Sequence, residues 1–306
     1  MRVLITGGNG FLGRNMIGRF YETFGEENVF HPSSNIFDLR SQSECKSLIT
    51  YIRPDIVVHA AGTVGGIGAN KDNPGKFMYE NLIMGANLIH ECKTNHIDKF
   101  IILGTVCSYP KFTPVPFKES DFWNGYPEET NAPYGIAKKT LIEMLISYRK
   151  QYGFKSNVLV PSNMYGPWDH FNLTTSHVIP ALIMKVDMAI KNNEPSITVW
   201  GTGEASREFL YVDDCIDAIV RAIQADTDSQ PINIGTGQEI KIIDLIEMIC
   251  DIMGYTGTIF FDKTKPDGQP RRCLDVSRAQ EVLNFKAKTS LREGLEKTIK
   301  WYKEEQ

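Results

Sequence analysis

A tyrosine and a lysine four positions apart have the spacing that most directly suggests chemistry. Tyr134 and Lys138 form a Y-x-x-x-K pattern at the start of a predicted helix, and residues four apart lie on one helix face. Because a nearby ammonium stabilises a tyrosinate, we expect Lys138 to lower the pKa of the Tyr134 phenol. The phenol would donate a proton to a carbonyl oxygen as a hydride arrives, which is general acid catalysis. Lys138 would also hydrogen-bond a nicotinamide ribose.

A hydroxyl follows the strand that precedes this helix. Thr105 comes directly after a strand predicted over residues 99–103, and ligands of open α/β sheets bind at the carboxyl ends of the strands. Thr105 is therefore a candidate to share the substrate oxygen with Tyr134. The alternative is a residue that caps a helix or turn.

A glycine-rich turn joins the first predicted strand to the first predicted helix. Gly7, Gly10 and Gly13 form a G-x-x-G-x-x-G pattern. A backbone without side chains can approach a pyrophosphate closely at a helix N-terminus. The strand–turn–helix context predicts a dinucleotide site, and a turn that holds no ligand is the alternative.

The residues expected to select between NAD and NADP(H) do not include the usual selective group for either cofactor. An NAD site usually has an Asp or Glu about 20 residues further on, which binds the ribose 2′-hydroxyl. Residues 31–35, His-Pro-Ser-Ser-Asn, hold neither a carboxylate nor an arginine. The missing carboxylate removes a repulsion against a 2′-phosphate and favours NADP(H). Arg14 and Arg40 are candidate phosphate contacts, or surface residues that serve solubility.

Short β-branched runs alternate with helical patterns through the first half of the chain, which predicts a doubly wound parallel α/β (Rossmann) fold. The predicted strands cover residues 3–6, 28–30, 55–59, 99–103 and 157–160, and the predicted helices residues 11–24, 41–52, 75–95 and 134–151. After residue 165 the pattern loosens. We expect a dinucleotide-binding domain over residues 1–165 and a smaller α/β substrate lobe over 166–306, packed as one compact unit with some segments crossing.

The composition sets broad limits. The 306 residues include 33 Lys and Arg against 37 Asp and Glu, a formal net charge of −4. This balance argues against a nucleic-acid partner, and the chain contains no apolar run of about 18 residues that would predict a membrane span. The apolar run at residues 3–6 is too short for a signal peptide, so we expect a cytoplasmic protein. The six cysteines form no C-x-x-C pair or histidine cluster, so we expect no metal site and mostly buried cysteines.

The order of these motifs resembles the extended short-chain dehydrogenase/reductase superfamily, and further segments resemble one branch, the GDP-L-fucose synthases. The resemblance runs over essentially the whole chain. The segments that carry it lie at residues 64–70 (VGGIGAN), 107–111 (CSYPK), 161–167 (PSNMYGP), 176–182 (SHVIPAL), 199–203 (VWGTG), 207–214 (REFLYVDD) and 265–270 (KPDGQP). It implies a GDP-4-keto-6-deoxymannose 3,5-epimerase/4-reductase that uses NADP(H).

The family assigns acid–base roles to a cysteine and a histidine in these segments, and Cys107 and His177 inherit them. A 4-keto group acidifies the C–H bonds at C3 and C5 of the sugar. Epimerisation needs a base to remove a proton and an acid to return one to the other face, and both residue types titrate near neutrality. Reduction at C4 would use Thr105, Tyr134 and Lys138. The alternatives are packing for Cys107 and capping or packing for His177.

The resemblance also implies two sets of binding residues. The cofactor set comprises Gly7, Gly10, Phe11, Leu12, Gly13, Asp38, Leu39, Leu103, Gly104, Lys138, Pro161, Asn163, Met164 and His177. The substrate set comprises Asn163, Lys185, Trp200, Arg207 and Asp267. In the second set Trp200 could stack on guanine, while Lys185 and Arg207 could face the diphosphate. Local alternatives are a solvated Lys185, a core Trp200, and an Arg207 paired with Glu208 or Asp213.

The chain departs from the family pattern at three positions. Lys185 stands where the family usually has Arg, Thr105 where it often has Ser, and Asn9 where its glycine turn often has a basic residue. The last change removes a candidate phosphate contact. In the superfamily, helices such as 75–95 and 134–151 commonly form a homodimeric four-helix bundle, or they merely cover the sheet.

Four other activities remain as alternatives. A reductase of a different GDP-4-keto-6-deoxy hexose or heptose would carry nearly the same motifs. A 4,6-dehydratase commonly has Asp-Glu after the strand-end threonine, where this chain has Val106 and Cys107. A UDP-sugar 4-epimerase would hold tightly bound NAD and need no net reductant. A non-catalytic dinucleotide-binding protein would lack the tyrosine or lysine of Y-x-x-x-K, and both are present.

Overall fold

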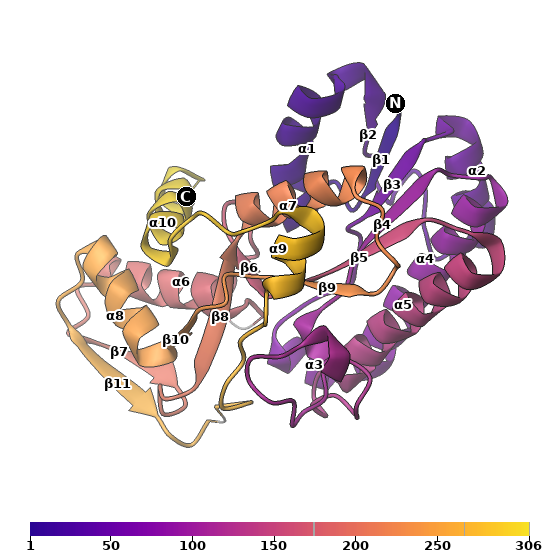
Figure 1. The fold of residues 1–306 in the computed structure, drawn as a ribbon. Coiled ribbons are helices and arrows are strands. Elements are labelled where there is room, and N and C mark those ends of the chain that lie inside the picture. The colour runs from indigo at the N-terminus through magenta and orange to yellow at the C-terminus, as the bar shows by residue number, and fades with distance from the viewer. Residues whose placement is uncertain (174, 266, 306) are drawn as a thin grey trace.

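The computed structural model describes residues 1–173, 175–265 and 267–305 and centres on a parallel β-sheet. In the described part of the chain this sheet has six strands in the order β2-β1-β3-β4-β5-β9 (Figure 1). Its members are β1 (Val3–Thr6), β2 (Val29–Phe30), β3 (Ile56–His59), β4 (Lys99–Leu103), β5 (Ser156–Pro161) and β9 (Pro231–Ile234). Every neighbouring pair is parallel, which confirms the predicted doubly wound α/β fold.

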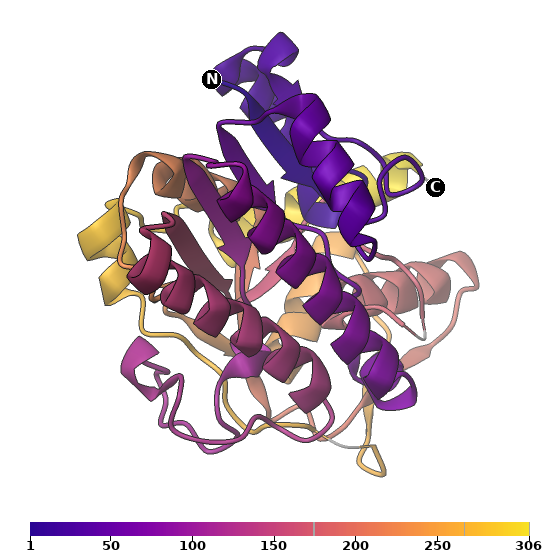
Figure 2. The ribbon, with the colours of Figure 1, turned by 90° about the vertical axis from the view of Figure 1, so that its right-hand side faces the viewer.

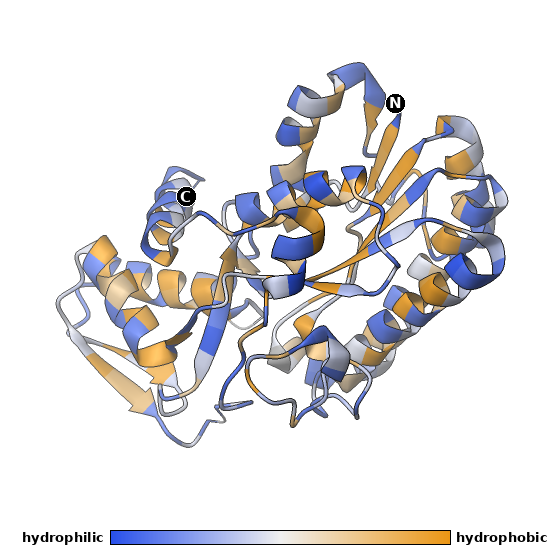
Figure 3. Ribbon diagram, in the orientation of Figure 1, coloured by the Kyte–Doolittle hydropathy of each residue, from blue (hydrophilic) through white to orange (hydrophobic). Residues whose placement is uncertain are grey.

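Helices cover both faces of this sheet, which is why its strands are apolar on both sides. One face carries α2 (Gln42–Ile52), α4 (Pro74–Thr94) and α5 (Ala132–Tyr152), with α4 and α5 side by side (Figure 2). The helices α1 (Phe11–Phe24) and α7 (Val212–Gln224) pack against the other face. Figure 3 shows hydrophobic strands between helices whose outer faces are hydrophilic. No helix in the described part of the chain is long and apolar enough to cross a membrane.

Segments from the second half of the chain form a smaller lobe beside the sheet, whereas β9, α7 and α9 (Ser277–Leu283) from the same half pack together at the main sheet. The helices of the lobe are α6 (Val178–Lys191), α8 (Ile242–Met253) and α10 (Leu291–Glu305), and its strands are β6 (Asn163–Tyr165), β7 (Ser196–Trp200), β8 (Ser206–Tyr211), β10 (Glu239–Lys241) and β11 (Thr258–Asp262). They form a sheet β10-β8-β6 and a pair β11-β7. One apolar core runs from Phe20 of α1 to Leu245 of α8, so the two halves share their interior.

Short elements and helix starts differ from the prediction. The unpredicted elements include α3 (Ile67–Asp72), the 3₁₀ helices η1 (Glu26–Asn28), η2 (Val106–Ser108) and η3 (Glu119–Asp121), the strands β6, β8 and β10, and helix α9. Helix α5 begins before Tyr134, because Pro133 fits the first turn of a helix. Five cysteines are buried and unpaired, as expected for packing residues: Cys45, Cys92, Cys215, Cys250 and Cys273.

Candidate active site

The turn between β1 and α1 is too closely packed for a side chain at Gly7 or Gly13. Gly7 has a φ of 78°, and a Cβ there would lie 2.6 Å from the backbone nitrogen of Ala61. A Cβ on Gly13 would collide with the carbonyl oxygen of Gly7. Gly10 precedes α1 and makes no side-chain cap, so the first amides of the helix remain available. The turn therefore fits a pyrophosphate group.

A cleft of about 380 Å³ opens beside the glycine turn. Gly7, Gly10, Asp38 and Leu39 of the predicted cofactor set line it. The remaining members of that set lie along the start of α1 (Phe11, Leu12, Gly13), after β4 or at its end (Leu103, Gly104), at the end of β5 (Pro161), in β6 (Asn163, Met164), in α5 (Lys138) and before α6 (His177). Leu103, Gly104 and Pro161 end or directly follow parallel strands, where this fold binds its ligands.

Thr105, Tyr134 and Lys138 converge where β4 meets α5. The Thr105 hydroxyl accepts a hydrogen bond from the backbone nitrogen of Cys107 at 3.2 Å, which caps η2. The same hydroxyl lies near the Tyr134 phenol, whose pKa it lowers. Thr105 thus caps η2, and its part in binding the substrate oxygen stays a prediction. Lys138 is only 4% exposed, and its Nζ lies 3.8 Å from where a Cβ on Gly62 would stand. The lysine therefore reaches the carboxyl end of the neighbouring strand β3.

Burial controls protonation of the tyrosine and the lysine. Desolvation raises the pKa of Tyr134, as does negative charge on Cys107, while the nearby Thr105 hydroxyl lowers it. Burial lowers the pKa of Lys138 from 10.5 to about 8. The expectation that Lys138 brings down the pKa of the phenol is wrong for this structure, because desolvation dominates. A phenol with a raised pKa keeps its proton at neutral pH, as a proton donor must.

Close packing holds Cys107 against this helix. A Cβ on Gly135 would lie 2.5 Å from the carbonyl oxygen of Cys107. The Ser108 hydroxyl donates to the carbonyl oxygen of Gly135 at 2.9 Å. These contacts fix η2 on the N-terminal turn of α5. Cys107 is half-buried and follows Thr105 by two positions, so its thiol belongs to the same site.

The structure adds Arg272, a residue that our reading of the sequence missed. Its Nη1 lies 3.8 Å from the sulfur of Cys107. Gln269 Oε1 accepts hydrogen bonds from Nε and Nη2 of Arg272 at 3.3 and 3.1 Å, and the Gln269 amide donates to the Lys111 carbonyl at 2.9 Å. The guanidinium is therefore held beside the thiol. Its nearness in sequence to the segment 265–270 is the one signal that could have found it.

His177 comes from a separate segment, directly before α6. The amide of Gly66 donates to the Thr175 carbonyl at 3.1 Å, which ties the loop after β3 to this segment. Surrounding protein and the charge of His170 lower the pKa of His177, although much of the residue is solvent-exposed. Its side chain does not cap α6. Within the described residues no hydrogen bond joins His177 to Cys107, so their joint action stays a prediction.

Trp200 stands exposed at the edge of the smaller lobe. Its 61% exposure shows that the alternative of a core tryptophan is wrong. The Nζ atoms of Lys185 and Lys265 lie 5.6 and 5.5 Å from the ring centroid, within the range of cation–π contact. An aromatic face flanked by two cations suits a nucleobase that carries phosphates.

Arg207 lies in strand β8 of the smaller lobe. Its Nη2 donates to the backbone carbonyl of Asp267 at 3.0 Å. In the described part of the chain no ion pair joins it to Glu208 or Asp213, so that alternative is wrong. Burial and the charge of Arg272 lower the pKa of Arg207 to about 10. Two guanidinium groups thus lie close together near Cys107, ready for an anionic ligand.

The side chains of Asp267 and Asn163 hydrogen-bond other residues of the protein in this structure. The Asp267 carboxylate accepts from the backbone nitrogen and hydroxyl of Thr202 at 2.7 and 2.8 Å. The Asn163 amide donates to the carbonyl oxygen of Glu208 at 2.8 Å. Both residues therefore shape the walls of the predicted substrate region.

Known proteins share this fold and these motifs. Residues 3–235 match the NAD dependent epimerase/dehydratase family. The chain is 39% identical over 297 residues to the GDP-L-fucose synthase of Sinorhizobium fredii, covering 97% of this chain and 94% of that protein. It is 36% identical over 305 residues to the GDP-L-colitose synthase of Yersinia pseudotuberculosis, covering 99% and 98%. A solved structure of GDP-mannoheptose C4 reductase from Campylobacter jejuni, with NADP bound, has a TM-score of 0.88 and 27% identity and covers 99% and 98%. The chain therefore belongs to the NAD dependent epimerase/dehydratase family and, within it, to the GDP-L-fucose synthases.

Proposed function

We propose that the protein converts a GDP-4-keto-6-deoxy sugar by epimerisation at C3 and C5 and NADPH-dependent reduction at C4, giving GDP-L-fucose or a close analogue. The observation that carries this proposal is one strand end that holds two kinds of acid–base group. The Thr105 hydroxyl lies near the Tyr134 phenol and lowers its pKa, and Cys107 follows two residues later, with its backbone nitrogen bonded to the same hydroxyl. A ketone held by the two hydroxyls would have its neighbouring C–H bonds near the thiol.

The glycine turn and its cleft fit a nicotinamide dinucleotide. The positions of Gly7 and Gly13 leave no room for a Cβ. A turn of bare backbone at a helix N-terminus is the kind of structure that binds a pyrophosphate. When bound, the reduced cofactor would supply the hydride. Lys138 faces Gly62 at the end of β3 and would hold the ribose next to the reacting ring. The NADP bound to the related heptose reductase supports NADP(H) as the cofactor.

For reduction at C4, Tyr134 supplies the proton. Its raised pKa keeps the phenol protonated until negative charge develops on the ketone oxygen. The Thr105 hydroxyl keeps the phenol aimed at that oxygen.

For epimerisation at C3 and C5, Cys107 and His177 exchange protons with the two faces of the sugar. Hydrogen bonds from Thr105 and Tyr134 to the C4 oxygen would stabilise the enolate formed when a proton leaves. Arg272, 3.8 Å from the sulfur of Cys107, places a positive charge beside the same group. A ketone, two hydroxyl donors and a thiol are sufficient for carbon–hydrogen exchange once His177 reaches the opposite face.

One turnover experiment in deuterated water tests this proposal. We expect NADPH to be consumed with GDP-4-keto-6-deoxymannose and the product to carry deuterium at C3 and C5. Product that remains fully protonated at both carbons would refute the epimerase half. It would instead support reduction alone, on another GDP-4-keto-6-deoxy hexose or heptose, which the likeness to a C4 reductase favours. Absence of NADPH consumption would refute the reductase half.

We also propose a cytoplasmic homodimer formed through α4 and α5. Helix α4 exposes Met78 by 38% and Tyr79 by 63%, apolar surface that a second copy would cover. An open depression of about 530 Å³ on α5 includes Ile136 and Met144 and would receive a partner helix. Light scattering at micromolar concentration should give the mass of two chains; the mass of one chain would reject the dimer.

A further inference from the structure

We infer that the dinucleotide site selects only weakly between NADPH and NADH, because the described residues around the 2′ position of the adenosine ribose offer no uncompensated cation. The inference rests on the proposed use of a nicotinamide dinucleotide. It concerns the adenosine end of the cleft, away from Tyr134 and Cys107. Weak selection would let either reduced cofactor serve the reaction.

The end of strand β2 identifies where the adenosine ribose would lie. β2 pairs in parallel with β1, so its carboxyl end lies next to the glycine turn. A Cβ on Gly8 would stand 2.7 Å from the Cβ of His31, which shows direct contact between the two segments. Pro32, Ser33 and Ser34 follow and line the cleft. A dinucleotide with its pyrophosphate on the turn would direct its ribose 2′ position at these residues.

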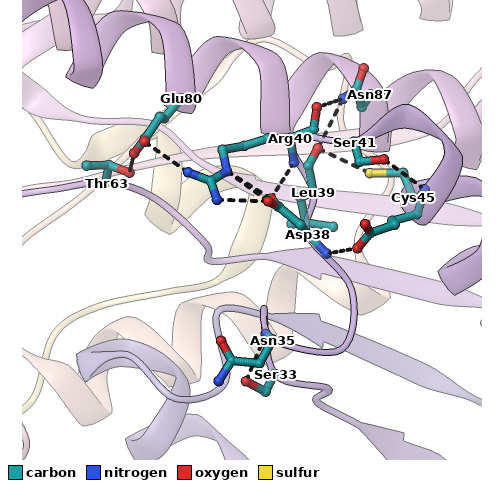
Figure 4. Close-up of polar contacts among 11 residues, drawn as sticks. Ser33, Asn35, Asp38, Leu39, Arg40, Ser41, Cys45, Thr63, Glu80 and Asn87 are labelled. Atoms are coloured by element: carbon teal, nitrogen blue, oxygen red, sulfur yellow. Dashed lines mark hydrogen bonds and ion pairs between the residues drawn. The ribbon is translucent and has the colours of Figure 1, made fainter.

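Arg40 is the one described residue with a positive charge in the cleft lining, and two carboxylates already bind it. Its Nη2 lies 2.8 Å from Asp38 Oδ2, and its Nη1 lies 3.1 Å from Glu80 Oε1. The other oxygen of Glu80 accepts from the Thr63 hydroxyl at 2.7 Å, which fixes this carboxylate in place. Figure 4 shows the guanidinium directed at Asp38 and Glu80, while Ser33 lies apart from this group.

The charge of this cluster disfavours a 2′-phosphate. Asp38, Glu80 and Arg40 together carry one net negative charge. The ion pairs raise the pKa of Arg40 and lower that of Asp38, so both of these groups stay ionised at neutral pH. To reach a phosphate, Arg40 would have to leave both carboxylates. Those carboxylates would then repel the phosphate from nearby.

Two further candidates for a phosphate contact are directed elsewhere. The Arg14 guanidinium lies over the Trp168 ring, 4.8 Å from its centroid, and its Nε donates to the Asn9 carbonyl at 3.0 Å. The His31 ring hydrogen-bonds the Tyr21 hydroxyl through Nε2 at 2.9 Å. Neither side chain lines the described cleft.

The serines that remain can serve either cofactor. A hydroxyl donates a hydrogen bond to a phosphate oxygen or accepts one from a ribose hydroxyl. Ser33 and Ser34 therefore neither repel a phosphate nor attract it by charge. The carboxylate that normally anchors the 2′-hydroxyl of NAD is also missing from residues 31–35. With neither selective group present, the two affinities should be similar.

Calorimetric titration of the purified chain with NADPH and with NADH, without sugar, tests the inference. We expect dissociation constants within about tenfold of each other. Ser34→Arg adds a cation at an exposed cleft position, and should tighten NADPH by about tenfold or more while changing NADH by less than about threefold. Ser34→Gln, which adds similar length without charge, is the matched control and should leave the ratio unchanged. Arg40→Gln should alter both affinities alike.

The outcomes separate this inference from the proposed function. A preference for either dinucleotide above about tenfold in the unaltered protein, or an Arg40→Gln variant that loses NADPH affinity alone, overturns the inference and leaves dinucleotide use intact. If Ser34→Arg leaves the ratio unchanged, the assigned 2′ position is wrong and the inference falls. Binding of neither dinucleotide overturns both the inference and the proposed function.

Discussion

Replacing Lys138 by Met should stabilise the protein at neutral pH while impairing reduction. The lysine side chain is 4% exposed, and burial alone lowers its pKa from 10.5 to about 8. A shift of that size corresponds to roughly 3 kcal/mol of unfavourable charge burial, at about 1.36 kcal/mol per pKa unit. Methionine fills similar volume without a charge, so Lys138→Met should unfold at higher denaturant concentration than the parent at pH 7, in the absence of dinucleotide.

The sign of the pH dependence makes this prediction specific. Between pH 8 and 10.5 the unfolded chain binds a proton at Lys138 that the folded chain has released, so the stability of the parent rises with pH. The advantage of Lys138→Met should therefore be greatest at pH 7 and shrink by roughly 3 kcal/mol as the pH approaches 10.5. Urea unfolding followed by tryptophan fluorescence, at several pH values, measures it. A difference that does not change with pH would refute an isolated buried ammonium at this position.

Three further predictions concern the proposed site. Tyr134→Phe removes the proton donor and should slow single-turnover oxidation of NADPH by roughly 10²- to 10⁴-fold, with dinucleotide affinity retained; an unchanged rate would exclude the phenol. Cys107→Ala should abolish deuterium incorporation at C3 and C5 seen by NMR; persistent exchange would assign the base elsewhere. Gly135→Ala should lower both the thermal unfolding temperature and the reduction rate, because its Cβ would lie 2.5 Å from the Cys107 carbonyl oxygen. Gly75→Ala, whose Cβ meets nothing within 4 Å, is the matched control and should be neutral or stabilising.

The parts of the fold that could be predicted are those with a strong local signal. The strand–turn–helix unit around Gly7 combines a buried β-branched run, glycines and a helical period. The smaller sheet lacked such a signal, because strand β10 has only three residues and strand β6 mixes polar and apolar side chains. Strand β5 also pairs with β9, although α6, β7, β8 and α7 lie between them in the sequence. No local sequence pattern predicts a pairing between such distant segments.

The same distinction applies to the site. Tyr134 and Lys138 could be found because both lie on one helix at fixed spacing. Arg272 comes 165 positions after Cys107 and meets it only through tertiary packing. The direction of the Tyr134 pKa shift could not be predicted, because desolvation depends on how tightly distant segments close over the phenol.

The chemistry of a 4-keto sugar gives the two proposed acid–base systems an order. The ketone acidifies C3 and C5, and reduction removes it, so proton exchange at carbon must precede hydride transfer. Negative charge on Cys107 raises the pKa of Tyr134, so the phenol holds its proton most firmly while the thiol is charged. Tyr134 can then hydrogen-bond the enolate oxygen during epimerisation and still have a proton to give when the hydride arrives. A C4-reduced, unepimerised sugar that the protein later converts to product would contradict this order.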